Sequence, residues 1–256
     1  MNNLFKMDLY RMRKARGFWV CLILTFAFSL LSTPLAALLV MLGRILSTDV
    51  PAMPETAKLS EILRTPIPAL NAMLCLLSAS SFFYADMENG YIKNIAGQMP
   101  KRGYTILSKF VTILPHNLLF MLVGVLGDLI GTVFFQRIAV DSAVLDSLRV
   151  FALKLLLLQS ICAILLLFSG SLQIKSLGTV MAVLFGMGLL TLVYFGIDAG
   201  LDKIFPKKSF LLNDYMPDQL LSESNPETLT ALIVSGVTIA VFLWLAIRIF
   251  DRKDVK

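Results

Sequence analysis

Residues 86–102 read DMENGYIKNIAGQMPKR, a polar interval between two strongly apolar segments. The interval begins with acidic residues, has glycines at 90 and 97, and ends on Pro100-Lys101-Arg102 before the chain turns apolar again at Ile106. A charged interval in this setting is typical of a short helix that lies outside a membrane. We interpret it as a cytoplasmic helix exposed to a partner, around which the rest of the chain is organised.

The composition on both sides of this interval is that of an integral membrane protein. The 256 residues are 57% hydrophobic and 16% charged, with a mean hydropathy of +0.78. Soluble domains average about 25% charged residues. Most basic residues stand at the ends of apolar segments, so the net charge of +6 does not indicate nucleic-acid binding. The three cysteines lie inside apolar runs without a CxxC pair, which predicts packed thiols rather than disulfides or metal ligands.

Six segments are apolar over roughly the 20 residues that a helix needs to span a bilayer. They lie at about 18–42, 67–85, 107–135, 150–169, 177–197 and 228–250. The first run is about 25 residues long, against about 7–15 for the apolar region of a signal peptide, and therefore predicts a retained span. We predict an all-α membrane protein with one transmembrane domain over residues 1–256.

Residues 1–17 interleave apolar and basic positions. On a helix, Phe5, Leu9 and Met12 share one face, whereas the basic residues Lys6 and Lys14 lie off it. This pattern predicts an N-terminal interfacial helix whose basic side chains face anionic lipid head groups. The alternative is a disordered basic anchor.

The distribution of Lys and Arg predicts that both chain ends are cytoplasmic. With the N-terminus inside, the inner segments carry 14 basic residues and the longer outer segments carry 9. Positive charge concentrates in cytoplasmic segments, and an even number of spans returns the C-terminus to the same side. We therefore expect a multi-pass protein of the cell membrane.

The outer segment 198–227 is too apolar for a solvated loop. Its apolar residues cluster in two short runs, 210–212 and 215–221. One interpretation is short helices that dip into the outer interface over a translocation mouth. The other is an amphipathic loop that lies on the head groups.

Asp128 is the one acid well inside an apolar run. It follows Lys109 by 19 residues, which on a helix places it about 28 Å away, near the outer face. Asp128 is either an acid in the substrate path or a solvated or paired acid at the outer rim. Gly127 and Gly131 form a small-xxx-small pair that lets a second helix approach closely.

Motifs for catalysis are absent. The sequence has no GxxxxGK[ST] phosphate loop and no GxSxG nucleophile motif. Its single histidine, His116, has neither an HExxH motif nor further His and Asp residues around it, so no metal site is predicted. We do not expect an enzyme, and energy for any transport would come from a partner or an ion gradient.

The topology and the residues of the organising interval together resemble the ABC-2 type permeases. The interval has the acid-then-glycine order of Asp86-Met87-Glu88-Asn89-Gly90-Tyr91-Ile92-Lys93, and its exit is Met99-Pro100-Lys101-Arg102-Gly103-Tyr104. A lysine, in Ser108-Lys109, then enters the next span. The resemblance covers the whole chain by topology and residues 86–109 by motif.

The resemblance implies a permease subunit that pairs with a second copy or a sibling and binds two cytoplasmic ABC ATPase subunits. ATP and magnesium would be bound by those partners, and this chain would bind no cofactor. The interval would then be a coupling helix between spans two and three, seated in a groove of the ATPase. The implied coupling residues are Asp86, Glu88, Asn89, Gly90, Tyr91, Ile92, Lys93 and Asn94, with the loop exit at Pro100, Lys101 and Arg102.

The size and plain architecture are similar to small exporters of amphipathic peptides, such as phenol-soluble modulin exporters and lantibiotic-immunity permeases. The expected function is export of an amphipathic or hydrophobic substrate, a peptide in the first instance, driven by a separate ATP-binding subunit. The alternatives are a secondary transporter or a membrane anchor that works without an ATPase.

Overall fold

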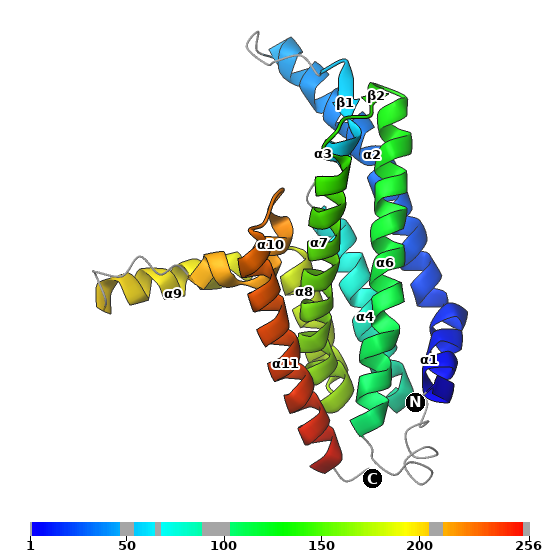
Figure 1. The fold of residues 1–256 in the computed structure, drawn as a ribbon, viewed down its shortest axis with the longest axis vertical. Helices are drawn as coiled ribbons and strands as arrows, with labels where there is room; N and C mark the ends of the chain where they lie inside the picture. Colours follow the sequence, from blue (N-terminus) through cyan, green and yellow to red (C-terminus); the bar gives the residue numbers. More distant parts are fainter. Residues whose placement is uncertain (1, 47–53, 65–67, 89–102, 205–211, 253–256) are drawn as a thin grey trace.

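The computed structural model describes residues 2–46, 54–64, 68–88, 103–204 and 212–252. Long helices run side by side along the main axis, and one helix, α9, projects sideways from them (Figure 1). The first half of the chain contains the helices α1 (Asn2–Lys14), α2 (Arg16–Leu46), α3 (Leu59–Arg64), α4 (Ala69–Glu88) and α6 (Gly103–Val133). The second half contains α7 (Val144–Leu165), the π-helical turn η1 (Leu166–Ser171), α8 (Lys175–Gly186), α9 (Thr191–Ile204), the 3-10 turn η2 (Leu212–Tyr215), α10 (Pro217–Ser222) and α11 (Thr228–Arg252).

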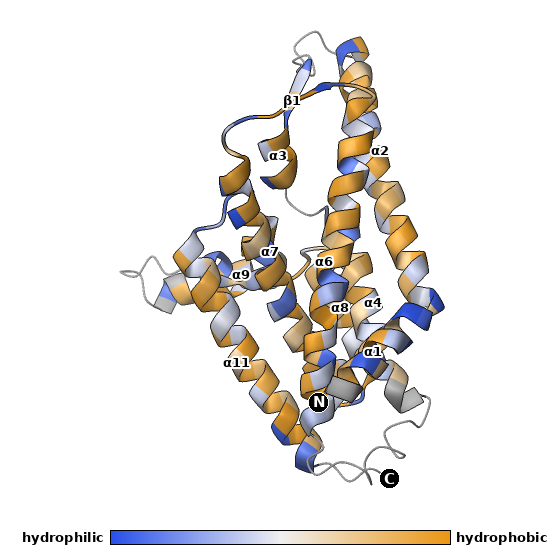
Figure 2. Ribbon diagram, turned by 45° about the vertical axis from the view of Figure 1, so that its right-hand side comes forward, coloured by the Kyte–Doolittle hydropathy of each residue, from blue (hydrophilic) through white to orange (hydrophobic). Residues whose placement is uncertain are grey.

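Among the residues that the structure describes, four helical segments are long and apolar enough to cross a membrane. They are Arg16–Ile45, Gly103–Val133, Val144–Ser171 and Thr228–Arg252, and they coincide with the first, third, fourth and sixth predicted spans. Hydrophobic residues run along their length in Figure 2. The apolar part of α4, Ala69–Ala85, matches the second predicted span but is shorter. A helical protein able to span a membrane is thus confirmed, whereas the count of six spans stays a prediction.

The fifth predicted span, 177–197, is divided by a sharp corner. Its two halves, α8 and α9, meet at 77°, so the pair is a broken span or a re-entrant segment. Gly188 stands in the corner with φ +67, a backbone conformation that a side chain disfavours. Hydropathy continues through the corner, which is why the sequence pattern predicted one helix.

The helix α6 packs directly against the backbone of α2. A Cβ atom on Gly127 would lie 2.9 Å from the carbonyl oxygen of Phe26, and one on Gly131 would lie 2.5 Å from that of Leu30. Only glycine leaves room for so close an approach. The small-xxx-small interpretation of Gly127 and Gly131 is therefore confirmed.

The N-terminal segment is a helix, as predicted, but its buried face is displaced from the predicted one. Met12 is buried, whereas Leu9 is 36% exposed. The second buried residue of this helix is Asp8, which faces α6. A hydrogen bond of the Asp8 carboxylate thus sets the rotation of α1, which an apolar pattern cannot predict.

Two short strands at the opposite end of the bundle depart from the all-α prediction. They are β1 (Thr56–Lys58) and β2 (Arg137–Ala139), which pair in parallel with Ala57 opposite Ile138. The pair joins the connection before α3 to the connection after α6 (Figure 1). Three-residue strands are too short to show an alternating pattern in the sequence.

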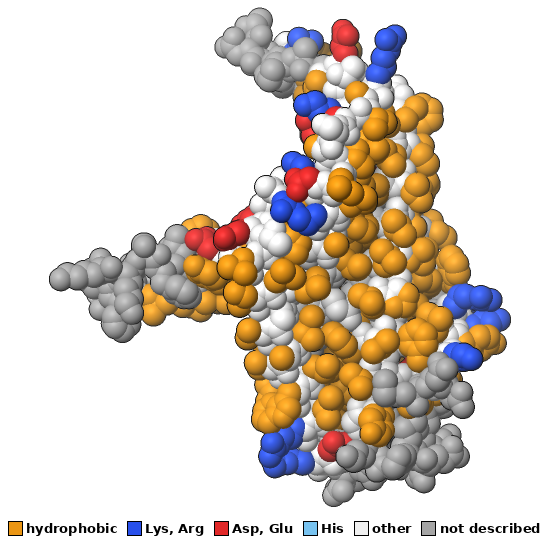
Figure 3. All heavy atoms as spheres, viewed as in Figure 1, with side chains coloured by type: hydrophobic (Ala, Val, Ile, Leu, Met, Phe, Trp, Pro, Cys, Tyr) orange, Lys and Arg blue, Asp and Glu red, His pale blue; other side chains and the backbone are white. Residues whose placement is uncertain are grey.

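The core of the bundle is α7 with η1. In its apolar window 78% of residues are buried, against 11% in that of α2. Cys75 and Cys162 are buried free thiols and Cys21 is a half-buried one, which agrees with the predicted packed thiols. In the face shown in Figure 3, hydrophobic side chains cover the flank of the bundle, and basic side chains gather beside α1 and at the end of α11. The outer helices thus turn apolar surface outward, as expected of a protein surrounded by lipid.

Candidate functional site

The predicted coupling residues begin in the last turn of α4. Asp86 and Glu88 belong to that turn, although their side chains are outside what the structure describes. The other predicted coupling and exit residues also lie outside the described residues: Asn89, Gly90, Tyr91, Ile92, Lys93, Asn94, Pro100, Lys101 and Arg102.

The two helices that flank this interval are joined by a buried lysine. The Nζ of Lys109, in the second turn of α6, donates a hydrogen bond of 2.7 Å to the carbonyl oxygen of Phe83 in α4. Lys109 is 2% exposed, and its ammonium lies 5.5 Å from the ring centre of Phe82. A buried cation is tolerated only where polar partners replace water. Lys109 therefore holds the end of α4 and the start of α6 as one unit.

A second contact ties α1 to the same place. The hydroxyl of Ser108 donates a hydrogen bond of 2.6 Å to Oδ2 of Asp8, and both residues are 2% exposed. Sequence reasoning passed over Asp8. Its signal was present, because Asp8 stands three residues after Phe5 and four before Met12, on the face assigned to apolar packing.

A third contact ties α11 to the start of α6. The backbone N–H of Gly103 donates a hydrogen bond of 2.7 Å to Oδ1 of Asp251. A carboxylate at a helix N-terminus is favourable, since the first N–H groups there have no partner within the helix. A Cβ on residue 103 would lie 2.7 Å from Ile247, so glycine allows this approach. We call the three contacts, Lys109–Phe83, Asp8–Ser108 and Gly103–Asp251, the end frame.

Asp128 lies in the other half of the bundle, at a cavity whose lining is mainly apolar and includes several polar side chains. The hydroxyl of Ser32 donates a hydrogen bond of 2.8 Å to Oδ1 of Asp128. The cavity and its mouth hold about 540 Å³, and Lys154 and Asn71 also line it. In the part of the chain that the structure describes, the buried oxygens Thr25 Oγ1 and Asn71 Oδ1 in its wall have no hydrogen-bond partner. Asp128 thus lines a cavity, as an acid in a substrate path would, and it is also paired through a hydrogen bond, as an acid at the outer rim would be. Both interpretations from the sequence stay open.

Lys154 is the functional candidate that sequence reasoning missed. It was counted with the basic residues of the outer segments, yet it is 1% exposed and its Nζ donates to the carbonyl oxygen of Arg64 at 2.8 Å. Its position inside the predicted span 150–169 was the available signal. An ionisable residue within a membrane segment is a functional candidate by default.

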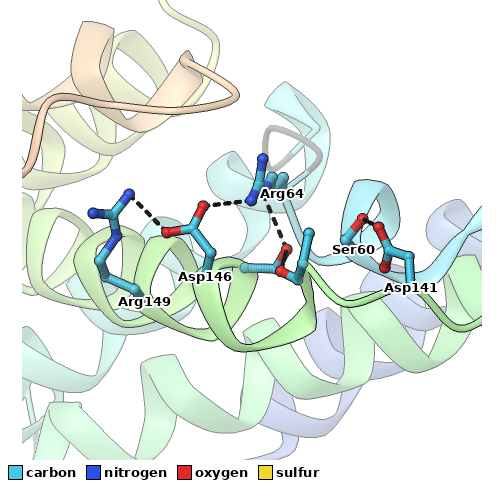
Figure 4. A network of polar contacts seen from close by, with 7 residues as sticks. Ser60, Arg64, Asp141, Asp146 and Arg149 are labelled. Atoms are coloured by element: carbon cyan, nitrogen blue, oxygen red, sulfur yellow. Dashed lines mark hydrogen bonds and ion pairs between the residues drawn. The ribbon is translucent and has the colours of Figure 1, made fainter.

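The short helix α3 closes the cavity on one side and is fastened to α7. Ile62 and Leu63 of α3 line the cavity. Arg64, at the end of α3, forms an ion pair with Asp146, and its Nε donates to the hydroxyl of Ser147 at 3.0 Å (Figure 4). Asp146 also pairs with Arg149 at 2.9 Å. The contacts of Arg64 with Asp146 and Ser147 thus fasten α3, which lines the cavity, to α7.

We expect the Arg64–Asp146 pair to contribute little free energy despite its good geometry. The two side chains are 29% and 45% exposed, so water screens the pair and a coupling energy of about 0.2–1 kcal/mol is expected. A double-mutant cycle with Arg64→Gln and Asp146→Asn, read by thermal unfolding in detergent, measures this value. The matched control is the more exposed pair Lys58–Glu61, separated by 3.7 Å, for which no measurable coupling is expected. A larger coupling in the control pair would contradict the role of partial burial.

His116 belongs to a buried hydrogen-bond network at the centre of the bundle. It is fully buried, and its Nε2 lies 3.0 Å from the hydroxyl of Ser78 in α4. Its Nδ1 lies 3.1 Å from Oδ1 of Asn117, whose Nδ2 donates to Gln159 in α7 at 3.0 Å. The network therefore joins α4, α6 and α7, and its polar groups use one another as partners.

In the described part of the segment after α9, residues 212–215 form a 3-10 turn and residues 217–222 form a short helix. The carboxylate of Asp198 accepts hydrogen bonds from the backbone N–H groups of Leu212 and Asn213, at 2.7 and 3.2 Å. The hydroxyl of Tyr194 donates to Asp218 in α10 at 3.2 Å. Burial raises the pKa of the Asp218 carboxyl above its ordinary value, while hydrogen bonds to the carboxylate act in the opposite direction. Residues 212–222 are thus held against α9 as two short helical segments, whereas the position of 198–227 relative to a membrane interface stays a prediction.

These helices border an apolar pocket. The pocket and its mouth hold about 850 Å³ between η1, α8, α10 and α11, and Phe185, Met216 and Phe242 are among its lining residues. Methionine side chains adapt to varied apolar ligands, and aromatic side chains offer large apolar surfaces. The pocket is therefore suited to hydrophobic groups.

Neither the comparison with protein-family models nor the comparison with curated protein sequences finds a match to this chain.

Proposed function

We propose that this chain is the membrane-spanning permease subunit of an ABC exporter. Two cytoplasmic ATP-binding subunits would drive it, and a second copy or a sibling would complete the pathway. ATP and magnesium would be bound by the ATP-binding subunits. Both chain ends would lie in the cytoplasm of a cell-membrane protein, and the substrate would be an amphipathic or hydrophobic molecule, with a peptide as the first candidate.

The end frame is the observation that carries this proposal. An ATP-binding partner that closes on its nucleotide moves as a rigid body. Its motion is transmitted to the membrane helices only if the helices that contact it move together. Lys109 binds α4 to α6 on the two sides of residues 89–102 through a buried hydrogen bond of 2.7 Å. A push on the interval would then reach both helices at once, and Asp8 and Asp251 would pass it to α1 and α11.

A secondary transporter is the second candidate, and the Asp128 cavity is the observation that favours it. Asp128 and Lys154 line one cavity in a membrane-spanning bundle. Ionisable residues in such a place mark ion and proton pathways in transporters. Reconstituted vesicles separate the two candidates: the first requires ATP and its partner subunit, and the second requires an ion gradient that an ionophore abolishes.

Glu88→Ala is expected to weaken assembly with the ATP-binding subunit and to reduce ATP-driven transport of an amphipathic peptide in parallel. Loss of a charge-assisted contact costs about 1.5–3 kcal/mol, which is about a tenfold or larger loss of affinity. The measurements are co-purification of the co-expressed subunit and uptake into inside-out vesicles. Glu223→Ala, an exposed acid beyond α10, is the control and is expected to leave both unchanged.

If Glu88 only stabilises the local backbone, its replacement changes thermal stability by about 0.3–1 kcal/mol and leaves assembly intact. Normal assembly and transport by Glu88→Ala would remove this residue from the coupling role.

A further inference from the structure

We infer that the pocket between α1, α2 and α4 is a binding site for a phospholipid with an anionic head group. We call it the α1 pocket. It opens at the end of the bundle that carries the end frame, and with its mouth it holds about 1060 Å³. Part of this volume is open to the surroundings, so the site is a groove with a wide mouth rather than a closed cavity.

The mouth of the α1 pocket is basic. Arg11 and Lys14 stand one helical turn apart on α1, and both line the pocket. The ammonium of Lys14 lies 5.8 Å from the ring centre of Tyr10, which also lines it. Asp8, where α1 packs on α6, accepts a hydrogen bond from Ser108 and holds the helix in this rotation. The cations are therefore presented to the pocket by a helix whose orientation is set by its own packing.

The interior of the α1 pocket is mainly apolar and extends into the bundle. Phe18 and Cys21 of α2 form one wall, and the other wall is formed by α4, through Leu77 and Phe82 together with the hydroxyl-bearing Ser78 and Ser81. The pocket reaches along α4 from Ala85 to Ser78, a distance of about 10 Å on a helix. The charged lining residues are thus confined to α1, and the rest of the lining is mainly apolar over a length that matches the upper part of an acyl chain.

This separation of charged and apolar lining selects the ligand. A soluble anion would use the basic mouth and leave the apolar walls empty, whereas an apolar molecule would leave the cations unused. A phospholipid has both parts in the order that the pocket offers them, and basic pockets between membrane helices are known to bind anionic head groups. Bound there, the lipid would join α1 to α4, the helix that leads into residues 89–102.

The test compares two charge-matched double variants of the full-length chain. Arg11→Gln with Lys14→Gln removes both cations of the pocket. Lys6→Gln with Arg13→Gln removes two exposed cations of the same helix that do not line it. Native mass spectrometry of the purified protein counts retained dioleoyl phosphatidylglycerol, with dioleoyl phosphatidylcholine as the neutral comparison. Circular dichroism and gel filtration check that each variant is folded.

The unmodified chain is expected to retain phosphatidylglycerol in preference to phosphatidylcholine. The pocket variant is expected to bind phosphatidylglycerol about 10- to 30-fold more weakly, since each basic residue contributes about a fivefold factor. The control variant is expected to stay within about twofold, because its cations lie outside the pocket. An equal loss in both variants, or no preference for the anionic lipid, would overturn the inference.

Gly17→Leu tests the site without removing a charge. Gly17 lines the α1 pocket, and a Cβ at this position meets nothing within 4 Å, so the new side chain projects into open space. Leucine also suits a helix better than glycine. The variant is expected to fold normally and to lose phosphatidylglycerol, and retention at the level of the unmodified chain would overturn the inference.

Soluble glycerol phosphate separates a lipid site from a simple phosphate site. Because the apolar walls contribute to binding of the acyl chain, millimolar glycerol phosphate is expected to leave the bound phosphatidylglycerol in place. Its displacement would show that the head group alone accounts for binding and would overturn the assignment to a phospholipid.

Discussion

Gly131→Ala is expected to force α2 away from α6 and to destabilise the bundle by about 1–3 kcal/mol, the usual cost of overpacking. The added methyl group would lie 2.5 Å from the carbonyl oxygen of Leu30 and 3.3 Å from its carbonyl carbon. These are backbone atoms, so no side-chain rotation relieves the clash. The measurement is the midpoint of thermal unfolding in detergent, followed by the tryptophan fluorescence of the purified chain.

Gly124→Ala is the matched control for this prediction. It makes the same change two turns earlier in α6, where the new Cβ would meet only the hydroxyl of Ser29, at 3.6 Å. That distance is ordinary van der Waals contact, and alanine favours a helix over glycine by about 0.8–1 kcal/mol. Gly124→Ala is therefore expected to be neutral or stabilising. If both variants had the same unfolding midpoint, the close packing of α6 on α2 would not limit stability.

Lys109→Met is expected to separate ATP hydrolysis from transport. Methionine keeps the unbranched shape and most of the length of the side chain but leaves the carbonyl oxygen of Phe83 without its donor in a site that is 2% exposed to solvent. An unsatisfied buried acceptor costs about 1–3 kcal/mol, part of which is returned because the ammonium no longer has to be buried. The loss falls on the junction of α4 and α6, so we expect the partner subunits to assemble but to drive little transport.

The measurements for Lys109→Met are thermal unfolding, co-purification of the ATP-binding subunit and peptide uptake per ATP hydrolysed. Lys175→Met is the control, since Lys175 is exposed and its ammonium lies 5.5 Å from the ring centre of Tyr84 in the same α4. Exposed substitutions of this kind change stability by about 0.5 kcal/mol or less. Unchanged coupling in Lys109→Met would mean that the end frame does not transmit motion, and the proposed function would lose its main support.

The sequence alone indicates part of the candidate site. Lys109 follows the basic exit of the interval in the sequence, and in the structure it joins α4 to α6. Asp128 was singled out as an acid within an apolar run, and it lines a cavity. The sequence does not predict the burial of Asp8 and Lys154. An acid near the N-terminus and a lysine near the end of a span are both expected to be exposed to solvent.

Local pattern and long-range contact account for different parts of this molecule. Hydropathy over about 20 residues reports whether a segment is stable in lipid, so it identified the apolar helices and the amphipathic N-terminal helix. Hydropathy does not report the direction in which a helix runs. The 77° corner between α8 and α9 therefore divides a segment that is apolar on both sides of the corner. The corner depends on the positive φ of Gly188, and the rotation of α1 depends on Ser108, 100 residues away.

The cavities and the end frame also depend on contacts between residues that are far apart in the sequence. Arg64 meets Asp146 across 82 positions of sequence, and Gly103 meets Asp251 across 148. Such pairs form only after the helices have packed, because hydrogen bonding requires atoms within about 3 Å, whereas a sequence pattern carries no distance between remote residues. The membrane class and the apolar segments therefore followed from residue chemistry alone, while the contacts that bind the helix ends into one unit required the folded arrangement.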